Sequence, residues 1–154
     1  MKDLKQQLII EQIDKKLKPY SSISQDNMPT DGWVKTIRTA IKMTLQQLGR
    51  RIGTTKQGAK KLEEREAKGS ITLNALRDAA NAFGMDLVYG FKPRKGSISK
   101  MIDEAALKKA TNIVMRTSTT MELEDQGVDN KRLKQAIKEK ALEISSKLPK
   151  YLWD

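Results

Sequence analysis

The segment TLQQLGRRIGTTKQGAKKLEERE, residues 44–66, contains two stretches of helical spacing that Gly53 separates. Thr44 followed three residues later by Gln47 has the pattern of a capping box, and Thr55 can cap a second helix. This second helix opens with polar residues only. The segment therefore predicts two helices joined by a tight turn, the second of which directs its first residues toward solvent. The residues expected to face inward are Leu45, Leu48 and Ile52 on the first helix, and Ala59 and Leu62 on the second.

The same spacing surrounds this segment and predicts a block of four short helices over residues 31–91. A helix before the segment and a helix after it complete the block, the last one capped by Thr72 and ended by Gly84. The four helices can share one small core. Its further inward residues are expected to be Val34, Ile37, Ala40, Ile41, Leu73, Leu76, Ala79, Ala80 and Phe83.

The flanking segments are also predicted to be helical. Residues 1–30 contain an amphipathic helix that ends before Pro19, followed by a linker rich in proline and serine. Residues 92–154 form a helical extension of two amphipathic helices, for which Ser99 and Asp129 are the expected caps. We therefore predict a mainly α protein. The apolar stripe of the N-terminal helix consists of Leu4, Leu8, Ile9, Ile13 and Leu17.

One short stretch departs from the helical pattern. In MDLVYGF, residues 85–91, Leu87, Tyr89 and Phe91 alternate with Val88 and Gly90. This alternation is typical of a short β-strand, which a second copy of the chain could pair. An extended tail lying across its own helices is the alternative.

Composition removes most enzyme mechanisms. The chain has no Cys and no His, so thiol nucleophiles, imidazole bases and the common zinc and haem ligand sets are absent. Ser99 with Lys100, and Asp103 with Glu104, are neighbours in a helix and do not face each other. We predict a protein that is not an enzyme and uses no metal or cofactor. Charges interrupt the N-terminal apolar residues, so we expect no signal peptide, no membrane span and a cytoplasmic location.

The charge balance points to a polyanionic partner. Thirty Lys and Arg residues against nineteen Asp and Glu residues give a formal charge of +11. Nucleic acid is the commonest partner of such a chain. A lysine-rich surface that serves only solubility is the alternative.

Two helices joined by a tight turn, the second with polar opening residues, form the arrangement that reads the major groove of DNA. The stretch LGRRIGTTKQGAKKLEE resembles the second and third helices of the Xre or phage-repressor family in particular. Gly49 stands where the two helices touch in that family, Gly53 opens the turn, and Thr55 caps the reading helix. Leu62 and Glu63 match the aliphatic–Glu pair that closes it. The resemblance implies a lambda-repressor-like core and a homodimer that binds double-stranded DNA on a two-fold site.

The resemblance further implies which residues meet the DNA. The base-reading residues would be Thr55, Lys56, Gln57, Lys60 and Lys61. Gln can bond bidentately to adenine, and Lys can donate to guanine O6 and N7. Helix ends and cationic groups favour phosphate, which suggests Lys42, Gln46, Arg65 and Lys68 as backbone contacts. Solvated charges are the alternative for each of these four.

Two features of the expected reading helix, a possible ion pair and an internal glycine, each allow two interpretations. Arg38 and Glu63 occupy positions where some phage repressors carry a buried ion pair; two exposed charges are the alternative. Gly58 lies inside the helix, where glycine costs about 1 kcal/mol relative to alanine. Either the backbone approaches DNA closely at Gly58, or the helix is marginally stable.

Nearly the whole chain resembles the family called mobile mystery protein A. The resemblance covers GWVKTIRTAIKMTLQQLGRRIGTTKQGAKKLEEREAKGSITLNALRDAANAFGMDLVYGF, RTSTTMELEDQ and the C-terminal LWD. That family consists of Xre-type regulators encoded beside mobile mystery protein B, which contains a Fic domain. The resemblance implies a transcriptional autorepressor and the antitoxin of a Fic toxin–antitoxin pair.

A short stretch would suit the antitoxin role. Fic inhibitors share a short motif: Ser or Thr, three arbitrary residues, Glu, and then Gly or Asn. Thr120 and Glu124 match the hydroxyl residue and the Glu of this motif. Asp125 stands where Gly or Asn is expected. The alternative is a solvent-facing acidic turn capped by Thr120, with Met121 and Leu123 packed inward. A protein that inhibits a Fic enzyme through its C-terminal helices, with DNA binding secondary, is the second functional reading.

Overall fold

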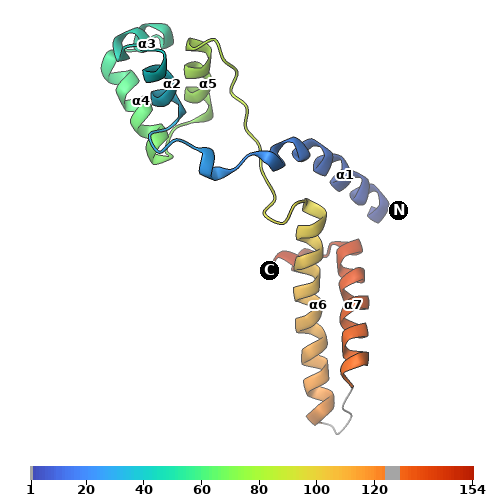
Figure 1. Cartoon of the computed structure of the whole chain (residues 1–154). Helices are drawn as coiled ribbons and strands as arrows, with labels where there is room; N and C mark the ends of the chain where they lie inside the picture. Colours follow the sequence, from blue (N-terminus) through green and yellow to red (C-terminus); the bar gives the residue numbers. More distant parts are fainter. Residues whose placement is uncertain (1, 124–128) are drawn as a thin grey trace. The chain divides into compact units, whose positions relative to one another are not determined.

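The computed structural model describes residues 2–123 and 129–154. Side chains are described for residues 4–120 and 129–154. This part of the chain is mainly helical (Figure 1). It contains seven α-helices and three short 3-10 helices and no strand. The α-helices are α1 (Lys2–Leu17), α2 (Trp33–Ala40), α3 (Leu45–Ile52), α4 (Lys56–Lys68), α5 (Leu73–Ala82), α6 (Ile98–Leu123) and α7 (Asn130–Lys147). The 3-10 helices are η1 (Lys18–Ser22), η2 (Gln25–Asn27) and η3 (Lys150–Trp153).

The chain divides into two compact units. Residues Ile23–Gly90 form one, which contains α2 to α5 and is called the four-helix unit below. Residues Met1–Ser22 and Phe91–Asp154 form the other, the helix-pair unit, which contains α1, α6 and α7. The N-terminal helix therefore belongs with the C-terminal helices and is not an appendage of the central block.

Threonine hydroxyls cap the N-termini of three helices of the four-helix unit, as the sequence predicts. The hydroxyl oxygens of Thr44, Thr55 and Thr72 accept hydrogen bonds from backbone N–H groups at 3.1, 3.0 and 3.1 Å. The Gln47 side chain returns a bond to the Thr44 backbone, which completes the predicted capping box. Gly53 ends α3 with φ +88°. These local signals fix the helix boundaries.

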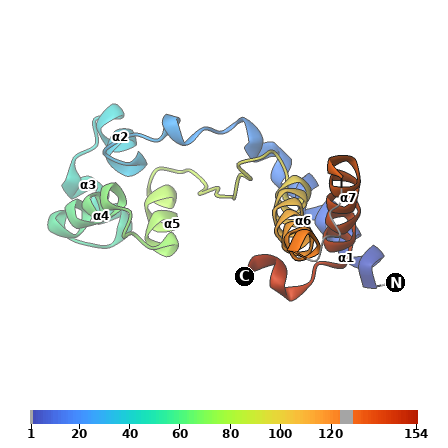
Figure 2. The ribbon, with the colours of Figure 1, turned by 90° about the horizontal axis from the view of Figure 1, so that it is seen from below.

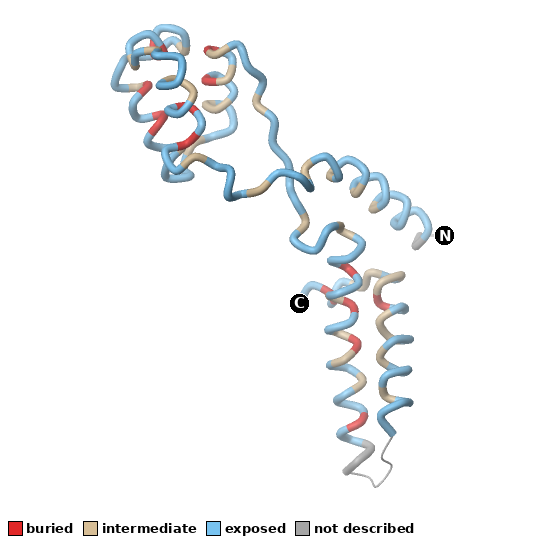
Figure 3. Tube along the Cα trace, in the orientation of Figure 1, coloured by how far each residue is buried: buried red, intermediate tan, exposed pale blue. Residues whose placement is uncertain are grey.

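The core of the four-helix unit is small (Figure 3). Buried side chains from α2 to α5 meet there: Val34, Leu48, Ala59, Leu62, Ala79 and Ala82. The prediction that Leu73 and Ile41 face inward is wrong, since they are 43% and 55% exposed, and Ala40 is exposed as well. Leu73 is the first residue of α5 and Ile41 follows the end of α2, so neither continues the helical stripe of its neighbours.

Two carboxylates fasten α4 to α2. The Arg38 Nε and Nη2 atoms donate to the Glu63 carboxylate, and Nη1 donates to the Met43 carbonyl at 3.0 Å. The Arg38 and Glu63 side chains are only 12% and 6% exposed, so the structure contains the buried ion pair and not two exposed charges. One turn further along α4, Glu66 accepts a hydrogen bond from the Val34 N–H at 2.8 Å and thereby caps α2.

In the helix-pair unit, α6 and α7 lie side by side and run in opposite directions (Figures 1 and 2). The buried positions of α6 include Ala106 and Ala110, which let the two helices approach closely. The core is completed by Ile102, Ile144 and Leu152, with Ile10 of α1 packed against it. In contrast, the predicted stripe of α1 is largely exposed, and Leu4 and Leu8 are 62% and 51% accessible.

The start of α6 corrects the prediction that Ser99 is its cap. The Ser97 hydroxyl accepts from Lys100 N–H at 3.1 Å, while Asp14 of α1 accepts from Ile98 N–H at 2.7 Å, Ser99 N–H at 3.3 Å and the Ser99 hydroxyl at 2.9 Å. Desolvation raises the pKa of Asp14, but these hydrogen bonds outweigh it and hold the pKa below its ordinary value. A carboxylate from α1 therefore holds the N-terminus of α6.

The predicted strand at residues 85–91 is wrong for this chain. Within the described residues no strand is present, and the stretch is extended without a neighbour to pair its backbone. Val88 and Phe91 are 72% and 81% exposed, whereas Leu87 is half-buried, so only part of the stretch packs against the protein.

Replacing Glu63 with Gln should destabilise the four-helix unit by about 3 kcal/mol or more, because it leaves the buried Arg38 charge without a counter-charge. Urea denaturation followed by Trp33 fluorescence, in a Trp153→Phe background, measures the change. Glu64→Gln is the matched control, since Glu64 is the exposed neighbour on the same helix. Equal stability of the two variants would show that the pair does not fasten α4.

Replacing Asp14 with Asn should loosen the start of α6 in a pH-dependent manner. Because folding lowers the pKa of Asp14, its charge stabilises the protein above the ordinary value of 3.8, and this contribution is lost as the pH falls through the lower folded value. Amide exchange in α6 should be faster in Asp14→Asn than in wild type at pH 7, and the difference should shrink below about pH 4. A difference that persists unchanged at pH 2 would contradict the assignment.

Candidate nucleic-acid interface

The turn between α3 and α4 is tight because a glycine lies where the two helices meet. A Cβ added to Gly49 would lie 2.8 Å from the Thr55 carbonyl oxygen, so only glycine permits this approach. The Gly49 carbonyl also accepts hydrogen bonds from Gly53 and Thr54 N–H at 2.9 and 2.7 Å. The glycine and these backbone hydrogen bonds thus hold the end of α3 close to the start of α4.

Helix α4 has two faces of opposite character. Ala59, Leu62 and Glu63 are buried and Glu66 is half-buried, and together they turn one face toward the rest of the unit. The opposite side and the first turn consist of exposed polar side chains. All the residues predicted to read bases are exposed: Thr55, Lys56, Gln57, Lys60 and Lys61.

The three lysines of this surface have no acidic partner. Within the described side chains, none of Lys56, Lys60 and Lys61 lies within 4.0 Å of a carboxylate oxygen, whereas Lys35 approaches Asp31 to 4.0 Å. Glu64 is the one acidic residue that shares the exposed side of α4. It comes one turn after Lys60, away from the first turn of the helix. The N-terminal end of α4 therefore presents uncompensated positive charge, to which the helix dipole adds.

Gly58 has a structural explanation that the sequence did not supply. A Cβ at this position would lie 2.1 Å from the Thr54 Oγ1 atom and 3.2 Å from its Cβ atom. The missing side chain therefore makes room for Thr54, which leads into the helix. Packing against Thr54 thus gives a third reason for the glycine, whose cost of about 1 kcal/mol to the helix relative to alanine remains.

The predicted phosphate contacts are all exposed but lie at different places. Lys42 lies in the turn between α2 and α3 with φ +56°, a left-handed conformation that is unusual for a residue with a side chain, and Gln46 lies in the first turn of α3. Arg65 and Lys68 lie in the last turn of α4, about 14 and 18 Å along the axis from Lys56. If α4 binds DNA through its first turn, Arg65 and Lys68 are too far away to contact the same phosphates as Lys56.

Two arginines of α3 were missed as candidates. Arg50 is exposed, and its neighbour Arg51 donates through Nη1 to the Ala82 carbonyl at 3.0 Å. Arg51 therefore ties α3 to the end of α5, whereas Arg50 is the additional cation available to a ligand. Arginine in the last turn of a helix also interacts favourably with the helix dipole, so the sequence alone could not separate these two roles.

The predicted Fic-inhibitory pair is only partly visible. Thr120 is exposed within α6, and its hydroxyl donates to the Arg116 carbonyl at 3.0 Å. It lies inside the helix and so does not cap a turn, which corrects the alternative reading of this stretch. Glu124 and the side chains of Met121 and Leu123 lie outside the described residues.

Comparison with protein-family models, with curated proteins and with solved structures gave no match to this chain. Within the part of the chain that the structure describes, no helix combines the length and apolar character needed to cross a bilayer. The functional interpretation of the α3–α4 surface therefore rests on its geometry, its charge and the sequence resemblance.

Proposed function

We propose that the four-helix unit is a lambda-repressor-like helix-turn-helix domain that binds double-stranded DNA with α4 as its reading helix. The observation that carries the proposal is the contrast between the two faces of α4. Buried contacts hold one face, and the first turn exposes Lys56 and Gln57, whose side chains have no partner among the described residues. An α-helix with its side chains is about 10–12 Å across, which matches the width of the major groove.

The residue types suit the roles assigned to them. Gln57 can form two hydrogen bonds with adenine, and Lys56, Lys60 and Lys61 can donate to guanine or to phosphate. Thr55 already caps α4, so its contribution to reading lies in setting the position of Lys56 and Gln57. Lys42, Gln46, Arg65 and Lys68 would bind the phosphate backbone. Such contacts fix the register of the protein and carry no sequence information.

The proposed biological role is transcriptional regulation by a homodimer in the cytoplasm. One reading helix contacts only a few base pairs, and two copies on a two-fold site double the contacts. Autorepression would place that site upstream of the protein's own gene. This part of the proposal is supported by the family resemblance alone.

The antitoxin role is a further part of the proposal and also rests on the resemblance. It requires a Fic-domain protein encoded beside this chain and a stable complex between the two products. Reading the adjacent open reading frame for a Fic motif, followed by co-purification of the two products, tests it. Co-purification that survives loss of DNA binding would favour the alternative reading, in which inhibition of the Fic enzyme is primary.

Replacing Lys56 or Gln57 with Ala should reduce sequence preference. Each lost base contact should cost about 1–3 kcal/mol of discrimination, measured as the ratio of affinities for a duplex from the upstream region and a random duplex of equal length. Lys68→Ala should weaken binding to both duplexes alike and reduce the slope of log K against log salt by about one.

Lys150→Ala is the matched control, since Lys150 is an exposed lysine of the helix-pair unit. It should change neither quantity. A protein that fails to bind either duplex at low salt, or that keeps its preference in both α4 variants, would refute the proposal.

A further inference from the structure

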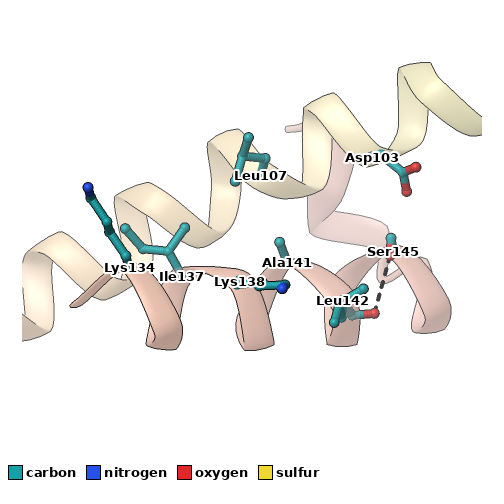
Figure 4. A pocket seen from close by; sticks show the side chains of 8 residues that line it. All are labelled: Asp103, Leu107, Lys134, Ile137, Lys138, Ala141, Leu142 and Ser145. Atoms are coloured by element: carbon teal, nitrogen blue, oxygen red, sulfur yellow. Dashed lines mark hydrogen bonds between the residues drawn. The ribbon is translucent and has the colours of Figure 1, made fainter. Parts of the chain in front are cut away.

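An open groove that the proposed function leaves unassigned runs between α6 and α7 in the helix-pair unit (Figure 4). It has a volume of about 460 Å³. Its lining is mainly apolar and comes from both helices: Leu107 from α6, and Ile137, Ala141 and Leu142 from α7. Lys134 stands at one end, Lys138 lies about midway along the α7 side, and Asp103 and Ser145 stand at the other end (Figure 4).

Apolar side chains of the groove remain exposed to solvent although α6 and α7 already pack against each other. Leu107 and Leu142 are 50% and 63% accessible. On the other side of Leu107 a second groove continues the apolar surface with Met101 and Trp153, which are 44% and 58% accessible. Large side chains that gather on one face in this way mark a surface that another molecule covers.

The positive charge of Lys134 and Lys138 favours an acidic partner in the groove. Lys134 and Lys138 are one helical turn apart, and neither lies within 4.0 Å of a described carboxylate oxygen. The two acidic residues of α7 are engaged elsewhere: Glu143 pairs with Lys140 and Lys147, and Glu139 accepts a hydrogen bond from Gln135. A partner that approaches the groove therefore meets two cations that no described carboxylate pairs, while Asp103 lies at the other end of the groove.

A second copy of this chain is a poor occupant. Its exposed amphipathic helix is α1, on which the four lysines Lys2, Lys5, Lys15 and Lys16 outnumber Asp3, Glu11 and Asp14, and Asp14 is already bound to the start of α6. Helix α7 of a second copy would bring further lysines. The groove instead fits carboxylates spaced one turn apart on a helix with an apolar stripe.

We propose that the groove between α6 and α7 binds an acidic amphipathic helix of a partner protein. The stretch from Lys134 to Ser145 is about 17 Å long, so the bound helix makes contact over about three turns. Its leucine-like side chains cover Leu107 and Leu142, and two of its Glu or Asp residues pair with Lys134 and Lys138. This mode of binding is the helix-in-groove type, and it does not depend on DNA binding by the four-helix unit.

Two synthetic peptides of 18 residues test the proposal with the full-length protein. Both carry leucines at helical spacing, and they differ only in having Glu or Lys at two positions one turn apart. Fluorescence anisotropy should show the Glu peptide binding at least tenfold more tightly than the Lys peptide. The double variant Lys134→Glu/Lys138→Glu should reverse this preference, and Arg132→Glu/Lys150→Glu, which changes two basic residues outside the groove, should preserve it.

Leu142→Ser tests the apolar part of the site. Because Leu142 is largely exposed, the variant should keep the melting temperature of the wild type and lose binding of both peptides. Three results would overturn the proposal: no preference between the peptides, a wild-type dimer that Leu142→Ser dissociates, or loss of duplex DNA binding in Lys134→Glu/Lys138→Glu. The second would assign the groove to another copy of the chain, and the third would assign its lysines to nucleic acid. Failure of DNA binding in the wild type would leave this test unaffected.

Discussion

The position of α4 depends on the way its inner face is fixed. Glu63 forms a buried ion pair with Arg38, Glu66 caps the start of α2, and Gly49 lets α3 approach the beginning of α4. These contacts join α4 to both neighbouring helices, and breaking the ion pair would leave a buried charge uncompensated. What remains free is the first turn with Lys56 and Gln57. A helix held this firmly can present side chains to a ligand with little loss of conformational entropy on binding.

Features that depend on neighbouring residues were predictable from the sequence. Thr44, Thr55 and Thr72 cap helices because a hydroxyl reaches N–H groups two or three residues ahead, and Gly53 ends α3 because it adopts a left-handed conformation without strain. The inward residues Leu48, Ala59 and Leu62 also follow from helical periodicity. Exposure of the residues at the start of α4 follows from the same pattern.

Features that depend on distant residues were not predictable in this way. Asp14 caps a helix that begins more than eighty residues later, and no local signal distinguishes it from any other charge on α1. Glu66 likewise finds its partner on α2. Residues 85–91 alternate like a strand, but a strand forms only when another backbone pairs with it, and no described segment of this chain does so. The reason for Gly58 was hidden because it lies in the packing of Thr54.

The two units divide the surface chemistry of the chain between them. The four-helix unit presents polar and cationic groups on the outer face of α4, whereas the helix-pair unit presents an apolar groove with two lysines that no described carboxylate pairs. The central claim is that the start of α4 enters duplex DNA. Titration of the ¹⁵N-labelled protein with the upstream duplex, followed by amide chemical shifts, tests it most directly. The account predicts that the largest changes fall on residues 54–61. Changes confined to α6 and α7, or none at low salt, would contradict it.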